Sequence, residues 1–134
     1  MVERTSSEGV EEFEGQVKLI EVVPDTFHEG QNQYHIGIVP NDETLLKDTK
    51  TGMFHEWLSI TKTSTPTSVS EGSKLDNYLK EIEVCIKETK KCELVSEVIE
   101  ALKGKNIRFV KKVIGREYDG HKSKPSFVPQ AVLN

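Results

Sequence analysis

Three stretches in the first half of the chain have the aliphatic and β-branched residues typical of β-strands, at 13–23, 33–39 and 54–61. Pro24-Asp25 ends the first stretch, and Pro40-Asn41 ends the second. Apolar and polar residues alternate along the second and third stretches, which is the pattern of strands with one face in a core. We therefore expect three consecutive strands.

The third stretch places the only tryptophan of the chain on its more polar side. Alternation puts Leu58 and Ile60 on one face, and Trp57, Ser59 and Thr61 on the other. If this face is exposed to solvent, Trp57 is available for binding. A tryptophan in a strand is, however, more often part of the core. Both interpretations stay open for Trp57.

Helical periodicity replaces strand alternation after a hydroxyl-rich loop at 61–73. Ser73 has the type and position of an N-cap, with Asp76 in the first turn of the helix. Apolar residues at helical spacing follow: Leu75, Tyr78, Leu79, Ile82 and Ile86. A second apolar stripe consists of Leu94, Val95, Val98, Ile99 and Leu102, with Gly104 as the C′ residue. We expect two helices here.

Two further strands are expected at 106–114 and 127–133. Asp119-Gly120 indicates a hairpin turn between them, and Pro129 indicates that the last strand lies at an edge or carries a bulge. Neither face of 106–114 is cleanly apolar, so we expect a twist or bulge near Val110-Lys111. The order β-β-β-α-α-β-β predicts a mainly β fold with a helical insertion.

The length of 134 residues fits one domain, and 35% hydrophobic with 30% charged residues is the composition of a soluble globular protein. Residues 1–12 are polar and acidic, so we expect a flexible tail followed by a single domain at 13–134. No apolar run approaches the roughly 20 residues that cross a bilayer, and the N-terminus has neither a basic start nor an apolar stretch. We expect a cytoplasmic protein that does not enter the membrane.

Charge is divided unevenly along the sequence. Residues 101–134 contain eight Lys and Arg against two acids, a net charge of +6, although the whole chain has −4. The first hundred residues therefore carry −10. A segregated basic segment is expected on a surface that binds a polyanion, and a solvated lysine-rich edge strand has the same composition.

The sequence has no GxSxG, HExxH, P-loop or GxGxxG motif of the kind that carries catalysis or binds cofactors. Cys85 and Cys92 are seven residues apart, which matches no zinc or redox motif, and we expect reduced thiols. The four histidines are scattered singly: His28, His35, His55 and His121. We therefore expect no catalysis, no metal and no cofactor. An enzyme whose catalytic residues lie far apart in sequence stays an alternative.

The element order and one local motif resemble a known fold family. Three strands, helices and a two-stranded hairpin make up a five-stranded Greek-key barrel of the OB type. Leu102-Lys103-Gly104-Lys105-Asn106-Ile107-Arg108-Phe109 resembles the helix-to-fourth-strand transition of single-stranded DNA-binding OB domains. The chain is similar to small OB-fold proteins of the replication protein A type, as found in archaea, phages and viruses, although its helical region is longer. The resemblance implies an OB-like barrel that binds single-stranded DNA or RNA in DNA replication.

In such a barrel, strands two and three form the ligand face, where bases stack on flat side chains and phosphates lie beside cations. Trp57 is then the first stacking candidate, and Tyr118 in the last hairpin is the second. The candidate cations lie at the end of strand three, along strand four and in the last loop: Lys62, Arg108, Lys111, Lys112, Arg116, Lys122 and Lys124. Which face of strand four its cations occupy stays open.

A protein-interaction module is the competing hypothesis, because OB barrels bind many kinds of partner. The net charge of −4 would repel nucleic acid unless the basic surface is separate. The second helical stripe, formed by Leu94, Val95, Val98 and Ile99, is wide enough to contact a protein partner or a second copy of the chain in a homo-oligomer. Ionic strength distinguishes the two, because salt weakens phosphate binding steeply and an apolar contact much less.

Overall fold

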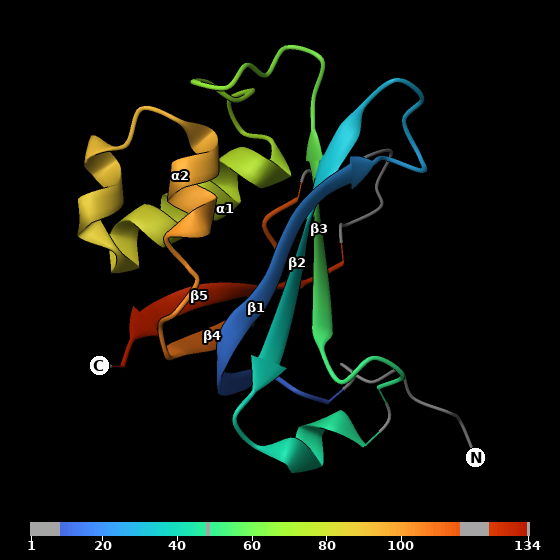
Figure 1. Ribbon diagram of the computed structural model, residues 1–134, viewed down its shortest axis with the longest axis vertical. Helices are drawn as coiled ribbons and strands as arrows, with labels where there is room; N and C mark the ends of the chain where they lie inside the picture. The colour runs from blue at the N-terminus through green and yellow to red at the C-terminus, as the bar shows by residue number, and fades with distance from the viewer. Residues whose placement is uncertain (1–8, 48, 116–123, 134) are drawn as a thin grey trace.

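The computed structural model describes residues 9–47, 49–115 and 124–133. Five strands form one antiparallel sheet in the order β3-β2-β1-β4-β5 (Figure 1). The strands are β1 Glu12–Pro24, β2 Asn32–Pro40, β3 Phe54–Ile60, β4 Ile107–Lys112 and β5 Ser126–Val132. Two helices, α1 Lys74–Cys85 and α2 Val95–Glu100, lie between β3 and β4 in sequence. Short 3₁₀ helices cover Glu43–Leu46 and Lys87–Lys91. The mainly β fold and the order of strands and helices are confirmed.

Strand β1 belongs to both halves of the sheet. Its first residues, Glu12 to Gly15, pair with β4, and Gly15 to Pro24 pair with β2. A Cβ atom on Gly15 would lie 2.6 Å from the carbonyl oxygen of Val39, so the strands approach this closely only with glycine there. Figure 1 shows β4 and β5 running at a steep angle across the end of β1, β2 and β3. The two halves of the sheet therefore face a common core.

An aromatic cluster connects four strands in this core. The ring of Phe13 on β1 lies 5.1 Å from Phe54 on β3, 5.4 Å from Phe109 on β4 and 4.8 Å from Phe127 on β5, measured between ring centroids. Each of these side chains is buried. The cluster brings both halves of the sheet together through apolar contact, which is the main favourable contribution to folding.

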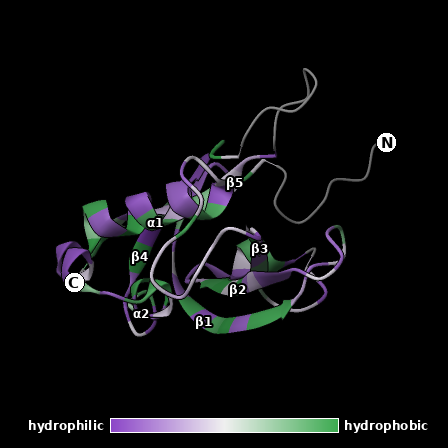
Figure 2. Ribbon diagram, turned by 90° about the horizontal axis from the view of Figure 1, so that it is seen from above, coloured by the Kyte–Doolittle hydropathy of each residue, from purple (hydrophilic) through white to green (hydrophobic). Residues whose placement is uncertain are grey.

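Helix α1 begins where the sequence predicted it. The backbone N–H of Asp76 donates a 3.1 Å hydrogen bond to the Ser73 hydroxyl, which confirms the N-cap. The buried residues of α1 are Leu75, Tyr78, Leu79 and Ile82. Hydrophobic and hydrophilic residues alternate in bands along α1 in Figure 2, as expected of a helix with one buried face.

Helix α2 is shorter than predicted, and Gly104 is not its C′ residue. The helix ends at Glu100 with Ala101 as C-cap. The N–H groups of Leu102 and Lys103 then bond to carbonyls three residues earlier, at Ile99 and Glu100, which tightens the chain into turns. Gly104 still adopts a positive φ of 78°, because a turn rather than the helix end requires it.

Strands β3 and β5 are the two edges of the sheet, and no ladder joins them in the part of the chain that the structure describes. A side chain of β3 and a side chain of α1 reach β5 instead. The N–H of Phe127 donates to Glu56 Oε2 at 3.3 Å, and the Tyr78 hydroxyl donates to the Phe127 carbonyl at 2.9 Å. Both polar backbone atoms of this β5 residue are thus bonded to side chains.

Pro129 lies on an edge strand and beside a bulge, so both predictions for it are confirmed. The pairing of β4 with β5 shifts between Arg108 and Phe109, where β5 has one extra residue. Of the twist or bulge expected near Val110-Lys111, the bulge is wrong, because the pairing is regular there. The predicted tail at 1–12 falls mostly outside the described residues, and β1 already begins at Glu12. The predicted turn at Asp119-Gly120 also lies outside them.

Candidate functional site

Trp57 lies on the outer face of the sheet, opposite the core. Along β3, Phe54, Glu56 and Leu58 are buried, and His55 and Trp57 point to the other side. The Trp57 side chain is 44% exposed. The predicted polar-side position of Trp57 is confirmed, and the core interpretation is wrong.

His35 supports the indole ring of Trp57 from the neighbouring strand. The two residues are directly paired between β2 and β3. Their rings are parallel within 6°, with centroids 3.9 Å apart. Because His35 covers one face of the indole, the exposed area of Trp57 comes from its other face and its edges. A flat aromatic surface is thus presented to solvent in a defined orientation.

A chain of hydrogen bonds holds His35 beneath Trp57. His35 Nδ1 lies 2.8 Å from Glu21 Oε1, and His35 Nε2 lies 2.7 Å from His55 Nδ1. His55 Nε2 in turn lies 2.6 Å from the Thr51 hydroxyl. We call Glu21, His35, His55 and Thr51 the histidine relay. His35 is only 7% exposed, so the ring is both buried and bonded at each nitrogen.

Sequence reasoning missed the histidine relay because it treated the histidines as scattered. The signal that could have found it is alternation: His55 precedes Trp57 by two residues, and His35 lies on the corresponding face of the preceding strand. Burial, together with the neighbouring His35, lowers the pKa of His55 below its ordinary value. Its surroundings therefore favour the neutral form of His55.

Gly37 leaves space for the side chains of Met53 and Leu19 beside the relay. A Cβ atom at this position would lie 2.7 Å from Met53 Sδ and 3.0 Å from Leu19 Cβ. The Met53 side chain occupies the space that any larger residue would need. Gly37 pairs with His55, so this packing lies directly against the relay.

The β1–β2 loop is fixed to the outer face of β3 by Asp25. Ser59 Oγ donates to Asp25 Oδ2 at 2.7 Å, and the backbone N–H of Phe27 donates to Asp25 Oδ1 at 2.9 Å. Burial raises the pKa of Asp25, but these hydrogen bonds and His28 outweigh it, so the pKa lies below its usual range. Phe27 is 89% exposed, an aromatic side chain that the sequence reasoning did not single out.

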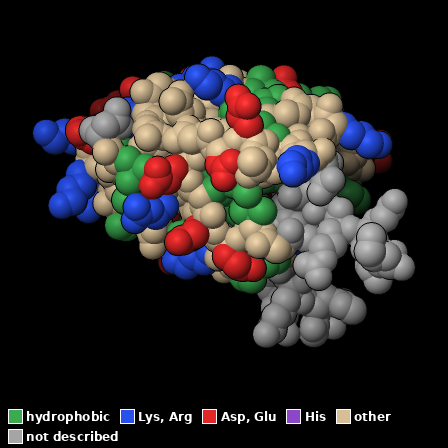
Figure 3. Space-filling view, turned by 90° about the horizontal axis from the view of Figure 1, so that it is seen from below, with side chains coloured by type: hydrophobic (Ala, Val, Ile, Leu, Met, Phe, Trp, Pro, Cys, Tyr) green, Lys and Arg blue, Asp and Glu red, His purple; other side chains and the backbone are tan. Residues whose placement is uncertain are grey.

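The cations predicted on β4 are engaged with acidic or aromatic neighbours. Arg108 lies 3.5 Å from Glu14, and Lys112 lies 2.5 Å from Glu81. Lys111 Nζ is 5.4 Å from the centroid of the Phe127 ring. On the face seen in Figure 3, basic and acidic side chains are interspersed. Both surface pairs are exposed, and such pairs contribute only about 0–1 kcal/mol each.

The remaining predicted site residues are placed only in part. Lys62 and Lys124 are exposed. Arg116, Tyr118 and Lys122 lie outside the described residues. Strands β2 and β1 separate Trp57 on β3 from the cations of β4 in the sheet. The structure thus brings Trp57 together with the histidine relay rather than with the strand-four cations.

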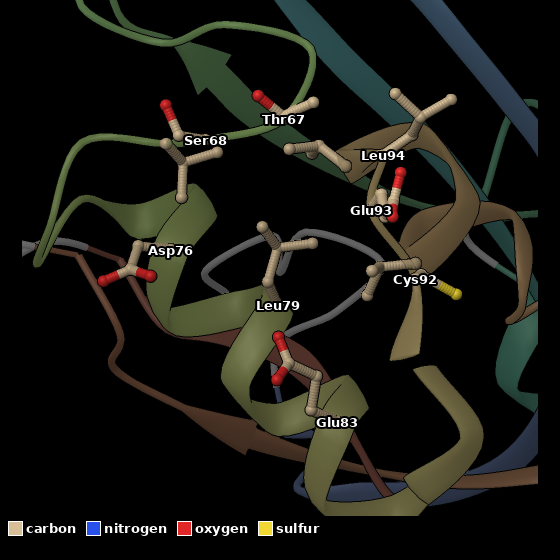
Figure 4. Close-up of a pocket in the computed structure, with 11 residues that line it drawn as sticks. Thr67, Ser68, Asp76, Leu79, Glu83, Cys92, Glu93 and Leu94 are labelled. Atoms are coloured by element: carbon tan, nitrogen blue, oxygen red, sulfur yellow. The ribbon is translucent and has the colours of Figure 1, made fainter. Parts of the chain in front are cut away.

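A groove of about 160 Å³ lies between α1, the start of α2 and the hydroxyl-rich loop (Figure 4). Leu79 and Val98 are buried in its lining, and Leu94 is partly exposed at its rim. Glu83 and Glu93 also line the groove, and neither forms an ion pair with another described residue. We call this feature the helical groove.

Cys92, in the lining of the helical groove, is a free thiol, and so is Cys85, in agreement with the prediction.

Within the described residues, no three His, Cys, Asp or Glu side chains are arranged to hold a metal ion. None of the helices in that part of the chain is long and apolar enough to span a membrane. In comparisons with protein-family models, with curated proteins and with solved structures, nothing matches this chain.

Proposed function

We propose that the chain is an OB-like barrel that binds single-stranded nucleic acid, with DNA as the preferred form, and carries out no catalysis. The strand order β3-β2-β1-β4-β5 is that of an OB barrel opened between β3 and β5. Glu56 on β3 bridges this opening through its bond to Phe127 on β5, and Tyr78 joins α1 to the same residue. The position of two helices between β3 and β4 agrees with the same architecture.

The exposed indole of Trp57 carries this proposal. It lies on the outer face of β2 and β3, where OB barrels hold their ligands, and its orientation is set by the parallel His35 ring. A nucleobase that stacks on a protein aromatic ring contributes about 1–3 kcal/mol, whatever the base. An oriented and half-exposed aromatic platform is the feature that such binding requires.

Phosphate contacts would come from cations around this platform. Lys62 is exposed and follows β3 by two residues, so it is the nearest in sequence to the Trp57 strand. Arg108 and Lys112 reach a phosphate only in competition with Glu14 and Glu81. The chain as a whole carries −4. We therefore expect a modest dependence of affinity on salt, with stacking as the larger contribution.

Fluorescence of Trp57 tests the proposal directly, because it is the only tryptophan in the chain. Titration with an oligothymidine of about 20 nucleotides should quench the emission, and added salt should partly reverse the quenching. Anisotropy of labelled DNA should show weaker binding for Trp57→Phe and a loss of about tenfold or more for Trp57→Ala. Val84→Ala, which truncates another exposed apolar side chain on α1, should bind as the wild type does. Unchanged fluorescence and anisotropy at tens of micromolar protein would refute the proposal.

A protein-interaction module remains the second candidate function, and the helical groove favours it. Its apolar lining beside Glu83 and Glu93 fits an extended segment that presents a Lys or Arg next to an aliphatic residue. Such a partner should bind less well to Glu83→Lys and Glu93→Lys, with Trp57→Ala unaffected. Binding of a basic, partly apolar peptide by the wild type, with no binding of oligothymidine, would favour this function over the first.

A further inference from the structure

The hydrogen bonds of the histidine relay are all satisfied when both imidazoles are neutral. A neutral imidazole donates one hydrogen bond and accepts one. The Thr51 hydroxyl can then donate to His55 Nε2, His55 Nδ1–H to His35 Nε2, and His35 Nδ1–H to the Glu21 carboxylate. Every donor in this arrangement points in the same direction, toward Glu21.

The same atoms also accommodate one additional proton. With both nitrogens of His35 protonated, the ring donates to Glu21 and to His55 Nδ1, and His55 Nε2–H donates to the Thr51 oxygen. A second proton would place two N–H groups against each other across the 2.7 Å between His35 Nε2 and His55 Nδ1. The relay therefore has two fully bonded states, and they differ by one proton.

The groups around the relay determine how the additional proton changes its charge. Glu21 on β1, Trp57 on β3 and Thr51 in the loop before β3 face the two imidazoles. Only Glu21 among them carries a charge, so uptake of the proton changes the net charge of the relay from −1 to zero. The proton is shared by a ring that lies parallel to the indole at 3.9 Å, where a cation is attracted to the aromatic face.

We propose that His35 and His55 are positioning residues for Trp57 that couple nucleic-acid binding to the uptake of a single proton. The inference rests on the proposed function and adds a form of regulation to the same site. An anionic strand on Trp57 is repelled by Glu21 when the relay is neutral, and this repulsion is cancelled when the relay holds its proton. Affinity thus rises as the pH falls through the titration of the relay.

The expected pH dependence has a limited slope. By linkage, uptake of one proton on binding changes the affinity by at most about tenfold per pH unit. The second proton is excluded by the short contact between His35 and His55, and the lowered pKa of His55 agrees with that exclusion. The affinity should therefore rise over one step and then level off.

The experiment is to measure the dissociation constant of labelled oligothymidine at fixed ionic strength between about pH 5.5 and 8. The wild type should bind several-fold more tightly at the acidic end, with no more than one decade per pH unit. His35→Gln and His55→Gln should remove most of this dependence. His28→Gln is the matched control, because His28 lies in the β1–β2 loop and bonds to Asp25, outside the relay.

If His35→Gln disturbs the fold, Glu21→Gln and an NMR titration of the free protein still test the inference. Glu21→Gln removes the counter-charge at a half-exposed position, so the step should shift to lower pH. Titration of the free protein by NMR should count one proton for His35 and His55 together. Uptake of two protons by His35 and His55 in this titration would overturn the inference. The same pH dependence of binding in the wild type and in His35→Gln would also overturn it, and both results would leave the stacking function intact. Absence of binding at every pH would refute the stacking function, and the proton count would still test the relay.

Discussion

Glu56 on β3 accepts a 3.3 Å hydrogen bond from the backbone N–H of Phe127 on β5, across the gap between the two edge strands. The Glu56 carboxyl is on the core side of the sheet and only 7% exposed. Burial raises its pKa to about 7, although Lys74, the Phe127 N–H and Ser126 favour the charged form. A group with a pKa near neutrality therefore bridges the two edge strands of the sheet.

The contribution of Glu56 to the stability of the protein should fall as the pH rises from 4.5 to about 7, the interval between the usual and the raised pKa of this carboxyl. In this interval the folded chain keeps the proton that the unfolded chain has lost, so raising the pH favours unfolding. The raised pKa corresponds to about 3 kcal/mol over the interval. Urea unfolding at several pH values measures the effect.

Glu56→Gln should flatten this pH dependence, because the amide has the same shape and does not ionise. Glu88→Gln, at an exposed position in the 3₁₀ helix Lys87–Lys91, should leave it as in the wild type. If the falling limb persists in Glu56→Gln, another group is responsible for it.

Tyr78→Phe should destabilise the protein by about 1–3 kcal/mol, because it removes the hydroxyl that donates to the carbonyl of the buried Phe127. The Tyr78 hydroxyl donates to the Phe127 carbonyl at 2.9 Å, and the side chain is fully buried. Tyr34→Phe is the matched control, since it removes the hydroxyl of a second buried tyrosine, on β2, away from Phe127. Thermal unfolding of both variants compares them, and equal losses would contradict the assigned role of Tyr78.

Gly15→Ala should cost more stability than Gly37→Ala. At Gly15 the new methyl group would lie 2.6 Å from a backbone oxygen of β2, so the paired strands must separate, which costs about 1–3 kcal/mol. At Gly37 the closest atom is the sulfur of a flexible methionine, which can move more cheaply. Chemical denaturation of the two variants gives the order, and a larger loss at Gly37 would show that the outer face is the more rigid.

Arg108→Ala and Lys112→Ala should each reduce the salt dependence of oligothymidine binding by less than about one unit of slope, because both side chains are shared with carboxylates. Glu81→Gln should have the opposite effect, since it releases Lys112 from its ion pair. Binding isotherms at several salt concentrations measure these slopes. A loss of a full unit or more on Lys112→Ala would place this lysine directly on a phosphate.

Local patterns were sufficient to predict most of the fold. The N-cap at Ser73 and the placement of Trp57 on the more polar face of its strand follow from spacing, because each depends on residues close in sequence. That this face is exposed to solvent did not follow from the spacing. The partners of His35 come from β1 and β3 and lie 14 and 20 residues away, so no local pattern connects them. The role of Glu56 could not be predicted for a similar reason. The alternation that places Leu58 in the core also places the Glu56 carboxyl there, and only the contact of this carboxyl with β5 explains its burial.

The bonds to Phe127 also restrict how another strand could pair with β5. An open sheet edge offers unpaired N–H and C=O groups to any strand that arrives, and this is a common origin of aggregation. At Phe127 both groups are already occupied, by a carboxylate from β3 and a phenol from α1. A foreign strand that approached β5 at this point would have to displace two buried side chains. The edge of the sheet at Phe127 is therefore protected from pairing with another strand by side chains of the same chain.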